Sequence, residues 1–306
     1  MNITTKVLIS DSIHPKFINK LEEIGIQVDY EPNVKNDRLF EIIPDYDGLV
    51  VRSRTKVTKE LIEQGLKLKV IGRAGVGLDN IDVTYANDKG IIVVNTPEAP
   101  TTSVAELVIG LMISVIRHIP LADSSMKEGK WIKSKLTGHE LKDKTLGIIG
   151  FGRVGSKVAR MASAIGMSIL FFDPYVSDEY SENLVAKRVN LETLLKCSDV
   201  VTLHVPLTSE TYHMIGRSEL NTMKKSAILI NTSRGAVIDQ IALVESLRSG
   251  EISGAGLDVY SNEPPKDLEL INLPNVICTP HIGSETLETK ERIATLLAEK
   301  VMEILV

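Results

Sequence analysis

The chain has 306 residues, of which 43% are hydrophobic and 25% charged, and its formal net charge is −5. This length is enough for two domains, and the composition is that of an ordinary globular protein, which excludes extended disorder and fibrous structure. The mild acidity favours neither nucleic acid nor an anionic membrane as a partner. Two cysteines are too few for a disulfide framework or a zinc site, and we expect both, Cys197 and Cys278, to be core residues.

Apolar runs and the amino terminus bear on where the protein resides. The longest apolar run, Leu107–Ile116, has ten residues, whereas a membrane-spanning helix needs about 20. The first residues contain neither a long apolar stretch nor a small-residue cleavage site, so we expect no secretory signal. We therefore predict a cytoplasmic protein that binds no membrane and no nucleic acid. The histidines have no ligand spacing, and we predict no metal site.

In the first third of the chain, short β-branched runs alternate with amphipathic segments, a pattern typical of α/β domains with a parallel sheet. The predicted strands are Val7–Ser10, Gly48–Ser53, Leu68–Arg73 and Ile91–Thr96, and the predicted helices include His14–Ile24 and Thr58–Gln64. The segment Thr96–Thr102, which contains two prolines, breaks the pattern and predicts a domain boundary. A long apolar helix, Ser103–His118, follows, and Ser103 and Glu106 have the spacing of a capping box.

A second alternation of strands and helices begins at Thr145. It contains six apolar strands, each followed by a helical segment or a polar turn. That number in about 135 residues is what a doubly wound dinucleotide-binding fold requires. The last segment, Ser284–Val306, is a single predicted helix that is too short to be a domain, so it must pack on another one.

A glycine-rich turn lies between the first strand and the first helix of this second region. Gly150, Gly152 and Gly155 have the G-x-G-x-x-G spacing, and Asp173 ends the next strand, 18 residues after Gly155. The three glycines allow a tight turn, the approach of a pyrophosphate to the helix N-terminus, and close packing of helix on strand. Asp173 would accept hydrogen bonds from the adenosine ribose and repel a 2′-phosphate, which predicts NAD rather than NADP. A glycine-rich turn without a ligand is the alternative.

Three later segments place polar residues where strands of the same sheet should end. They are Asn231–Gly235, Leu257–Pro265 and Thr279–Ser284. A doubly wound sheet binds its ligands at the carboxyl edge, so we expect Arg234, Glu263 and His281 to converge there. Arginine binds a carboxylate through two hydrogen bonds, histidine takes a hydroxyl proton as hydride leaves the adjacent carbon, and glutamate fixes the imidazole tautomer. This set suits hydride transfer at a 2-hydroxy acid.

These segments and the motif GRAGVGLDNID, residues 72–82, resemble the D-isomer-specific 2-hydroxyacid dehydrogenases, and the resemblance runs essentially from end to end. It implies that Arg234, Glu263 and His281 are the catalytic residues. It also implies two Rossmann-like, doubly wound parallel-sheet domains, with an NAD-binding domain of residues 99–282 inserted into a substrate-binding domain of residues 1–98 and 283–306. Beyond the glycines and Asp173, the expected cofactor contacts are Arg153, Val154, His204, Pro206, Thr232, Ser233, Asp258 and Gly283. For His204 a packed core histidine is an equal alternative.

Within the family, three segments are most similar to the D-3-phosphoglycerate dehydrogenases: VRSRTKVT (residues 51–58), IGRAGVGLDNID (residues 71–82) and SMKEGKW (residues 125–131). That branch implies NAD-dependent oxidation of D-3-phosphoglycerate to 3-phosphohydroxypyruvate, the first step of serine biosynthesis. Three arginines at strand ends would suit a phosphate, although arginines in such places are usually solvated. The expected substrate contacts are Arg52, Ser53, Arg54, Arg73, Gly75 and Val76.

Two departures leave alternatives open. Many phosphoglycerate dehydrogenases have Asn where this chain has Pro100, and glyoxylate and hydroxypyruvate reductases also lack that Asn. Reduction of glyoxylate or hydroxypyruvate, or dehydrogenation of another D-2-hydroxy acid, is therefore the nearest alternative. The chain ends at Val306, directly after the closing helix, so we expect the carboxy-terminal serine-sensing domain of longer relatives to be absent. A remote alternative is an NAD-sensing interaction protein like the corepressors of this fold, which carry extensions that we do not expect here.

The helix Ser103–His118 also bears on the oligomeric state. Its apolar residues cover more of its circumference than one core face requires. They are Val104, Leu107, Val108, Leu111, Met112 and Val115. A symmetric partner is the simplest cover for such a helix, so we predict a homodimer that forms through the nucleotide domain.

Overall fold

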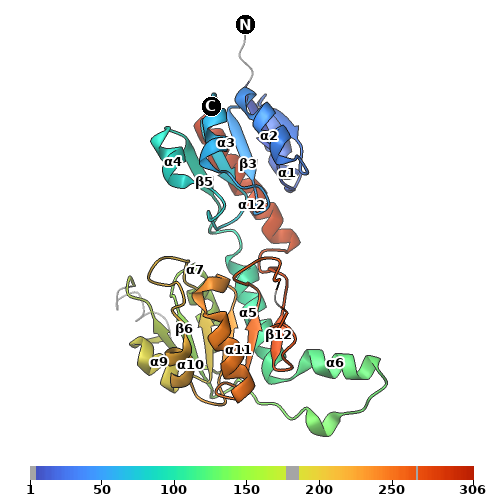
Figure 1. The fold of residues 1–306 in the computed structure, drawn as a ribbon, viewed down its shortest axis with the longest axis vertical. Coiled ribbons are helices and arrows are strands. Elements are labelled where there is room, and N and C mark those ends of the chain that lie inside the picture. Colours follow the sequence, from blue (N-terminus) through green and yellow to red (C-terminus); the bar gives the residue numbers. More distant parts are fainter. Residues whose placement is uncertain (1–4, 177–185, 267) are drawn as a thin grey trace. The chain divides into compact units, whose positions relative to one another are not determined.

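A computed structural model describes residues 5–176, 186–266 and 268–306 (Figure 1). The chain forms two compact units. Unit 1 consists of Met1–Pro100 and Ser284–Val306, and unit 2, inserted into it, is Thr101–Gly283.

Unit 1 has a five-stranded parallel sheet in the order β2-β1-β3-β4-β5. Its strands are β1 (Lys6–Ile9), β2 (Gln27–Tyr30), β3 (Gly48–Val51), β4 (Val70–Arg73) and β5 (Ile92–Asn95). Its helices are α1 (Lys16–Glu22), α2 (Asn36–Ile42), α3 (Lys59–Gln64), α4 (Val83–Asp88) and α12 (Leu287–Leu305), with a 3-10 turn η1 (Ile43–Asp45). The winding of the sheet reverses between β1 and β3, and doubly wound sheets bind their ligands at such a switch point.

Two apolar layers cover the faces of this sheet. Val7 and Ile9 of β1 belong to the layer that contains Phe17 of α1 and Leu297 of α12. Leu8 belongs to the opposite layer, to which α2, α3 and α4 contribute. Successive side chains of a strand point to opposite faces, so a strand that is covered on both sides is apolar throughout. This explains why β1 and β3 appear in the sequence as short continuous apolar runs.

Unit 2 has a seven-stranded parallel sheet in the order β12-β11-β10-β9-β6-β7-β8. Its strands are β6 (Thr145–Ile149), β7 (Ser168–Phe172), β8 (Ala186–Arg188), β9 (Val200–Leu203), β10 (Ile228–Asn231), β11 (Gly254–Leu257) and β12 (Val276–Cys278). Its helices are α5 (Thr101–Ile116), α6 (Ile119–Lys127), α7 (Arg153–Ala164), α9 (Leu191–Cys197), α10 (Arg217–Thr222) and α11 (Gln240–Ser249), with 3-10 turns η2 (Lys133–Lys135) and η3 (Gly235–Val237). The switch point lies between β6 and β9, and the prediction of two doubly wound parallel-sheet domains is confirmed.

Several local features differ from the sequence-based predictions. Helix α5 begins at Thr101, so the predicted capping box at Ser103 is wrong, because Ser103 lies inside the first turn and is buried. The prediction that both cysteines are core residues is also wrong. Cys197, the last residue of α9, is exposed, and Cys278 is half-buried.

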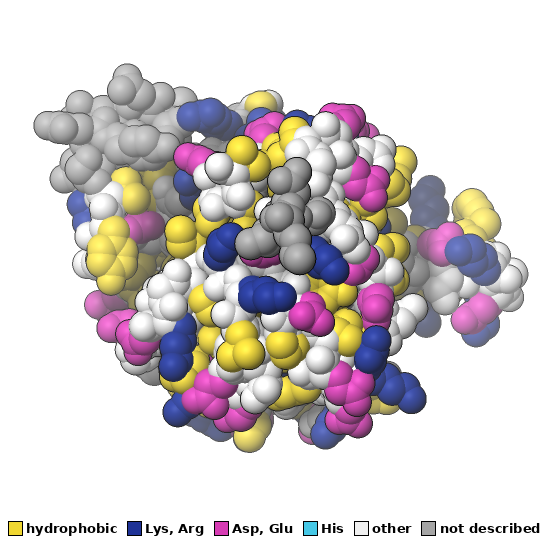
Figure 2. Space-filling view, turned by 90° about the horizontal axis from the view of Figure 1, so that it is seen from above, with side chains coloured by type: hydrophobic (Ala, Val, Ile, Leu, Met, Phe, Trp, Pro, Cys, Tyr) yellow, Lys and Arg dark blue, Asp and Glu magenta, His cyan; other side chains and the backbone are white. Residues whose placement is uncertain are grey.

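The surface and the helix lengths bear on membrane contact. On the face shown in Figure 2, basic and acidic side chains are interspersed among apolar ones. Within the described ranges, no single helix is long and apolar enough to span a membrane. Helices α5 and α6 would be long and apolar enough only if they were joined, but they are bent by 65° at the break between them.

Candidate active site

The glycine-rich turn follows β6, at the switch point of unit 2. Gly150 has a φ of 91°, a region that favours glycine, and a Cβ there would lie 2.7 Å from the carbonyl carbon of His204. A Cβ on Gly155 would lie 2.2 Å from the carbonyl oxygen of Gly150, so α7 packs directly on the turn. At Gly152, the N-cap of α7, a Cβ would meet no described atom within 4 Å. The free N–H groups of the helix therefore adjoin open space that suits a pyrophosphate.

Asp173 follows β7, the strand beside β6. Its carboxylate accepts a 2.8 Å hydrogen bond from the backbone N–H of Phe151 and another of 2.8 Å from that of Tyr175. These two donors hold the carboxylate next to the glycine-rich turn. Since a carboxylate has about four acceptor positions, it can still accept hydrogen bonds from a ribose diol.

The loop after β10 contains a buried hydroxyl with no partner. Asn231 organises this loop, since its Oδ1 accepts from the N–H and the hydroxyl of Ser233 at 3.0 and 2.9 Å, and its Nδ2 donates to the carbonyl of Arg234 at 2.9 Å. The Thr232 hydroxyl has no hydrogen-bond partner among the described residues, although it is buried. An unsatisfied buried hydroxyl is costly. Thr232 is therefore well suited to bind a polar group of a cofactor.

Four further expected cofactor residues lie after β9 and at the start of α7. His204 is half-buried, the Nε2 of its ring lies 3.0 Å from the Thr202 hydroxyl, and burial lowers the pKa of the ring to about 3. The ring is therefore neutral at neutral pH, and the backbone of His204 lies against Gly150. Pro206 is exposed in the loop after β9, and Arg153 and Val154 form the first turn of α7.

His281 and Glu263 form a hydrogen-bonded pair in the loops that follow β12 and β11. His281 Nδ1 lies 2.6 Å from Glu263 Oε2, and Glu263 Oε1 accepts a 3.1 Å hydrogen bond from the N–H of Tyr260. Because Nδ1 is engaged by the carboxylate, Nε2 is the ring nitrogen available to a substrate. This is the arrangement of a general acid–base whose tautomer is fixed by a carboxylate.

Each member of the pair favours the charged form of the other. The hydrogen bond to Glu263 raises the pKa of His281 above its ordinary value, although burial and the charge of Arg234 oppose this. Burial tends to raise the pKa of Glu263, but the hydrogen bond and charge of His281 outweigh it, so that pKa lies below its ordinary value. The charge of Arg234 lowers the pKa of both groups. The Arg234 Nη1 donates a 2.7 Å hydrogen bond to the carbonyl of Ser233.

The backbone of His281 is strained, and Asp258 holds it in place. His281 has a φ of 54°, a left-handed conformation that costs a non-glycine residue about 1–2 kcal/mol. Asp258 is fully buried and accepts hydrogen bonds from the Thr279 hydroxyl at 2.5 Å, the Ile282 N–H at 2.8 Å and the Gly283 N–H at 2.9 Å. The carboxylate thus fixes the loop on both sides of His281.

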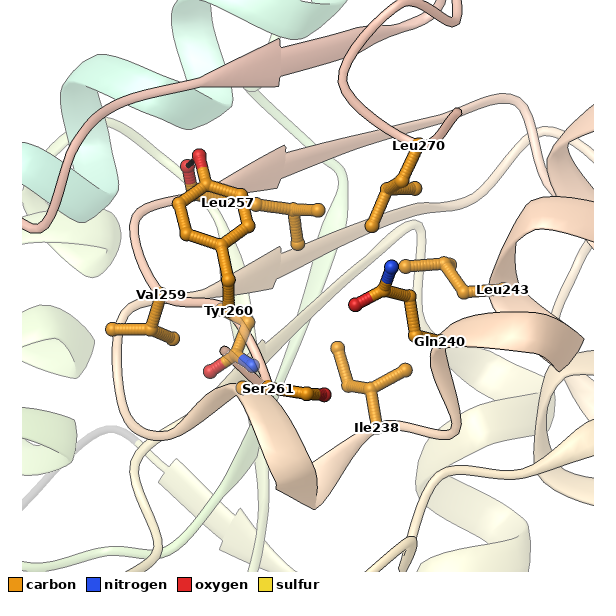
Figure 3. Close-up of a pocket in the computed structure, with 10 residues that line it drawn as sticks. Ile238, Gln240, Leu243, Leu257, Val259, Tyr260, Ser261 and Leu270 are labelled. Atoms are coloured by element: carbon orange, nitrogen blue, oxygen red, sulfur yellow. Dashed lines mark hydrogen bonds between the residues drawn. The ribbon is translucent and has the colours of Figure 1, made fainter. Parts of the chain in front are cut away.

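The loops that carry Arg234 and Glu263 touch each other at Gly235. A Cβ on Gly235 would lie 1.9 Å from the carbonyl carbon of Tyr260 and 2.3 Å from the nitrogen of Ser261. A hollow beside this contact, shown in Figure 3, has a mainly apolar lining with a few polar groups. Its labelled residues are Ile238, Gln240, Leu243, Leu257, Val259, Tyr260, Ser261 and Leu270. The close contact at Gly235 fixes the separation of the two loops.

In unit 1, the loop after β3 carries three of the expected substrate residues and is held by Asp11, which follows β1. Asp11 is buried and accepts hydrogen bonds from Arg52 N at 2.6 Å, Thr55 N at 3.2 Å and Thr55 Oγ1 at 3.0 Å. It also accepts a 2.8 Å hydrogen bond from Arg54 Nε, and Arg54 Nη1 donates to a backbone carbonyl at 3.2 Å. The Arg54 guanidinium therefore stabilises this loop, whereas Ser53 is exposed.

The other expected substrate residues of unit 1 lie at the end of β4 and beyond it. Arg73 is the last residue of β4, and its Nη1 donates a 2.9 Å hydrogen bond to the carbonyl of Ala74. Gly75 has a φ of 141°, and Val76 is 41% exposed. Arg52, after β3, donates a 2.5 Å hydrogen bond from Nη2 to Glu285.

The sequence matches the model of the D-isomer specific 2-hydroxyacid dehydrogenase NAD-binding domain over residues 109–283. The chain belongs to the D-isomer-specific 2-hydroxyacid dehydrogenases. Unit 2 contains the NAD-binding domain of this enzyme family, and NAD is its cofactor. The open space at Gly152, the carboxylate of Asp173 and the unsatisfied hydroxyl of Thr232 all fit this cofactor. Within the described ranges, no group of three His, Cys, Asp or Glu side chains could hold a metal ion.

The chain is similar to relatives that are named for different substrates. It is 49% identical over 301 residues to a D-3-phosphoglycerate dehydrogenase of Methanocaldococcus jannaschii, covering 98% of this chain and 57% of that protein. The chain spans only 54–57% of the length of three such dehydrogenases that it matches. It is 50% identical over 274 residues to a hydroxypyruvate reductase of Thermotoga maritima, with 89% of each covered. A solved glyoxylate reductase from Paecilomyes thermophila has a TM-score of 0.91 at 33% identity, with 100% of this chain and 96% of that chain covered.

Three residues that hold these loops are absent from the sequence-based prediction. Asp11 and Asn80 hold the loop after β3, since Asn80 Nδ2 donates to the carbonyls of Arg52 and Thr55 at 2.7 and 2.6 Å. Glu285 pairs with Arg52. For Asp11 a signal does exist, because it is an acidic residue directly after an apolar strand of a parallel sheet.

Proposed function

We propose that this chain catalyses hydride transfer between NAD and C2 of a D-2-hydroxy acid. The observation that carries the proposal is the hydrogen-bonded pair of His281 and Glu263, 2.6 Å apart, at the same sheet edge as the glycine-rich turn. NAD, which the glycine-rich turn and Asp173 would hold, would supply the acceptor and donor of the hydride. The residues of the chain bind the acid and move the proton.

Each residue of the trio has one role in this proposal. The fork of Arg234 binds the substrate carboxylate with two hydrogen bonds. In the oxidation, the neutral His281 accepts the hydroxyl proton at Nε2, and the Glu263 carboxylate stabilises the imidazolium that forms. In the reduction, the imidazolium returns that proton to the carbonyl oxygen. Asp258 keeps His281 in the position that these transfers require.

For the substrate we propose D-3-phosphoglycerate, which is oxidised to 3-phosphohydroxypyruvate in the first step of serine biosynthesis. The similarity to the Methanocaldococcus jannaschii phosphoglycerate dehydrogenase supports this substrate. The strand-end arginines Arg52 and Arg73 of unit 1 are suitable cations for the phosphate. The cytoplasm is the compartment that we propose for this reaction.

Reduction of hydroxypyruvate or glyoxylate is the second candidate. The hydroxypyruvate reductase of Thermotoga maritima is as similar to this chain and covers more of its own length. The guanidinium of Arg54 is bound to Asp11 and to a backbone carbonyl. Arg54 is therefore less available than expected as one of the three arginines that would bind the phosphate. Pro100 also departs from the pattern of many phosphoglycerate dehydrogenases.

A substrate panel followed at the nicotinamide absorbance band separates these candidates. With NADH, we expect a higher kcat/KM for 3-phosphohydroxypyruvate than for hydroxypyruvate or glyoxylate. With NAD, we expect D-3-phosphoglycerate to be oxidised and its L-isomer to be inert. A higher kcat/KM for hydroxypyruvate or glyoxylate would select the second candidate, and no turnover with any of these acids would contradict both.

We further propose that the protein is a homodimer that forms through unit 2. Helix α5 combines residues buried within unit 2 with further apolar residues that are only partly buried. The segment after it carries exposed apolar side chains at Ile119 (47%), Leu121 (50%), Met126 (58%) and Trp131 (78%). A run of exposed apolar residues marks an interaction surface, and a second copy of the chain is the partner that we propose.

A further inference from the structure

The side chain of Arg52 is bound by a carboxylate of its own unit. Arg52 Nη2 lies 2.5 Å from Glu285 Oε1, and the other oxygen of Glu285 lies 2.7 Å from Lys290 Nζ. The Arg52 and Glu285 side chains are 29% and 32% exposed, so the pair is partly shielded from water but accessible. One carboxylate therefore bridges two cations.

The backbone of Arg52 is fixed at the switch point of the unit 1 sheet. Its N–H donates to Asp11, which follows β1, and its carbonyl accepts from Asn80. The Arg52 side chain thus extends from a loop whose backbone is held by hydrogen bonds. This loop lies at the switch point, where a doubly wound sheet binds its ligands. Glu285 follows His281 by four residues along the chain. The Glu285 carboxylate is therefore bound to the Arg52 guanidinium at a sheet edge where a ligand anion is expected.

Glu285 keeps its negative charge at neutral pH. Burial tends to raise its pKa, but the hydrogen bonds from Lys290 and Arg52 outweigh burial, and the pKa lies below its ordinary value. An incoming anion that reaches Arg52 must either share the guanidinium with this carboxylate or displace it. Two like charges in contact repel each other, and a partly buried site screens this repulsion less than bulk water does.

We propose that Glu285 is a specificity-determining residue that competes with the substrate's distal anionic group for Arg52. This inference rests on the proposed function, in which Arg52 binds that distal group. The repulsion acts on a phosphorylated acid, which places a dianion at Arg52. It leaves the unphosphorylated acid almost unaffected, because a distal hydroxyl carries no charge. Glu285 therefore lowers the preference of this enzyme for phosphorylated substrates.

The variant Glu285→Gln tests the proposal in steady-state reduction with NADH. We expect KM for 3-phosphohydroxypyruvate to fall about tenfold and KM for hydroxypyruvate to change less than about twofold, because only the dianion is repelled. The kcat values should change little, since in the proposed function Glu285 acts on the distal group of the substrate and not on C2. The matched control is Glu291→Gln, which removes a carboxylate and its ion pair with Lys16 from α12 and should leave both KM values unchanged. In an Arg52→Gln background, Glu285→Gln should no longer lower either KM.

A titration with inorganic phosphate tests the same residue without turnover. Phosphate should raise the melting temperature of Glu285→Gln at about tenfold lower concentration than that of the unaltered enzyme or of Glu291→Gln. If no 2-oxo acid is reduced, the proposed function fails while this titration still decides the role of Glu285. The inference would be overturned if Glu285→Gln changed both KM values equally, or if it still lowered KM for 3-phosphohydroxypyruvate in the Arg52→Gln background. It would also be overturned if the phosphate concentration that raises the melting temperature were unchanged.

Discussion

The Asp173 carboxylate is a fixed negative charge beside the glycine-rich turn, held by the backbone N–H groups of Phe151 and Tyr175. A 2′-phosphate on the adenosine ribose would lie against it, and two like charges 4 Å apart cost about 1–4 kcal/mol in a partly solvated site. We therefore expect NAD to be preferred over NADP. Replacing Asp173 with Ala should lower the ratio of kcat/KM for NAD to that for NADP by about tenfold.

The Asp173→Asn variant is the control for size, because it keeps the shape of the side chain while removing its charge. It should lower the ratio of kcat/KM for NAD to that for NADP about as much as Asp173→Ala does. Equal kcat/KM for NAD and NADP in the unaltered enzyme would contradict this role of Asp173.

The pKa of His281 should determine the pH profile. An ordinary imidazole titrates near ~6.5, and the hydrogen bond to Glu263 raises this pKa. Oxidation needs neutral His281, so its kcat/KM should rise with pH through the raised value. Reduction needs the imidazolium, so its kcat/KM should fall over the same range. Rates in both directions, measured from pH 5 to pH 10 in steps of about half a unit, check this expectation.

Two variants test whether the pair acts as described. His281→Ala should lose roughly 10²–10⁴-fold in kcat, the usual contribution of a general acid–base. Glu263→Gln removes the charge that favours the imidazolium, so the pH profile should move to lower pH while the Kd for NAD changes little. Near-normal kcat in His281→Ala with an unchanged pH profile would show that water handles the proton.

At the level of the loops, the contact between Gly235 and the Tyr260–Ser261 backbone should be intolerant of any side chain. A Cβ would lie 1.9 Å from a backbone carbon, which cannot rotate away. We expect Gly235→Ala to lower the free energy of unfolding by about 1–3 kcal/mol and to lower kcat, because the Arg234 and Glu263 loops must separate. Thermal denaturation and steady-state rates check both effects.

Gly216→Ala is the control for this substitution. Gly216 is the N-cap of α10, and a Cβ there would lie 3.4 Å from the nearest side-chain atom, an ordinary contact. It should change stability and kcat little. If Gly235→Ala behaved like this control, the backbone contact would not determine the separation of the two loops.

The buried strands of both sheets could be predicted from the sequence, and so could the edge strands β5 and β12, whereas the edge strands β2 and β8 could not. Strands such as β1 and β9 are covered on both faces, so their sequences are short apolar runs. Strands β2 (QVDY) and β8 (AKR) lie at sheet edges, where polar residues are tolerated and no apolar pattern remains. The start of α5 was misplaced because Ser103 has the sequence context of an N-cap, although the helix already begins after Pro100.

Across the whole molecule, the sequence predicts which polar residues follow strands but not how they pair. Parallel strands end at the same sheet edge, so the positions of Arg234, Glu263 and His281 follow from the order of motifs. The pairing of Arg54 with Asp11 and of Arg52 with Glu285 joins residues 43 and 233 positions apart. Neither periodicity nor motif spacing carries information about such pairs.

The oligomeric state tests the surface that we assign to unit 2. We expect light scattering at micromolar concentration to give twice the monomer mass. Replacing Trp131, which is 78% exposed, and Met126, which is 58% exposed, with Ser should weaken the dimer without lowering the melting temperature of the monomer. A monomer mass for the unaltered protein would contradict the proposed homodimer.

The most direct test of the central claim is the fate of the hydrogen at C2. D-3-phosphoglycerate or D-glycerate labelled with deuterium at C2 is incubated with NAD and the enzyme, and the reduced cofactor is analysed by mass spectrometry. Hydride transfer from C2 predicts reduced cofactor that carries one deuterium, and almost none of it with His281→Ala. Reduced cofactor without deuterium, or none with either labelled acid, would contradict the claim.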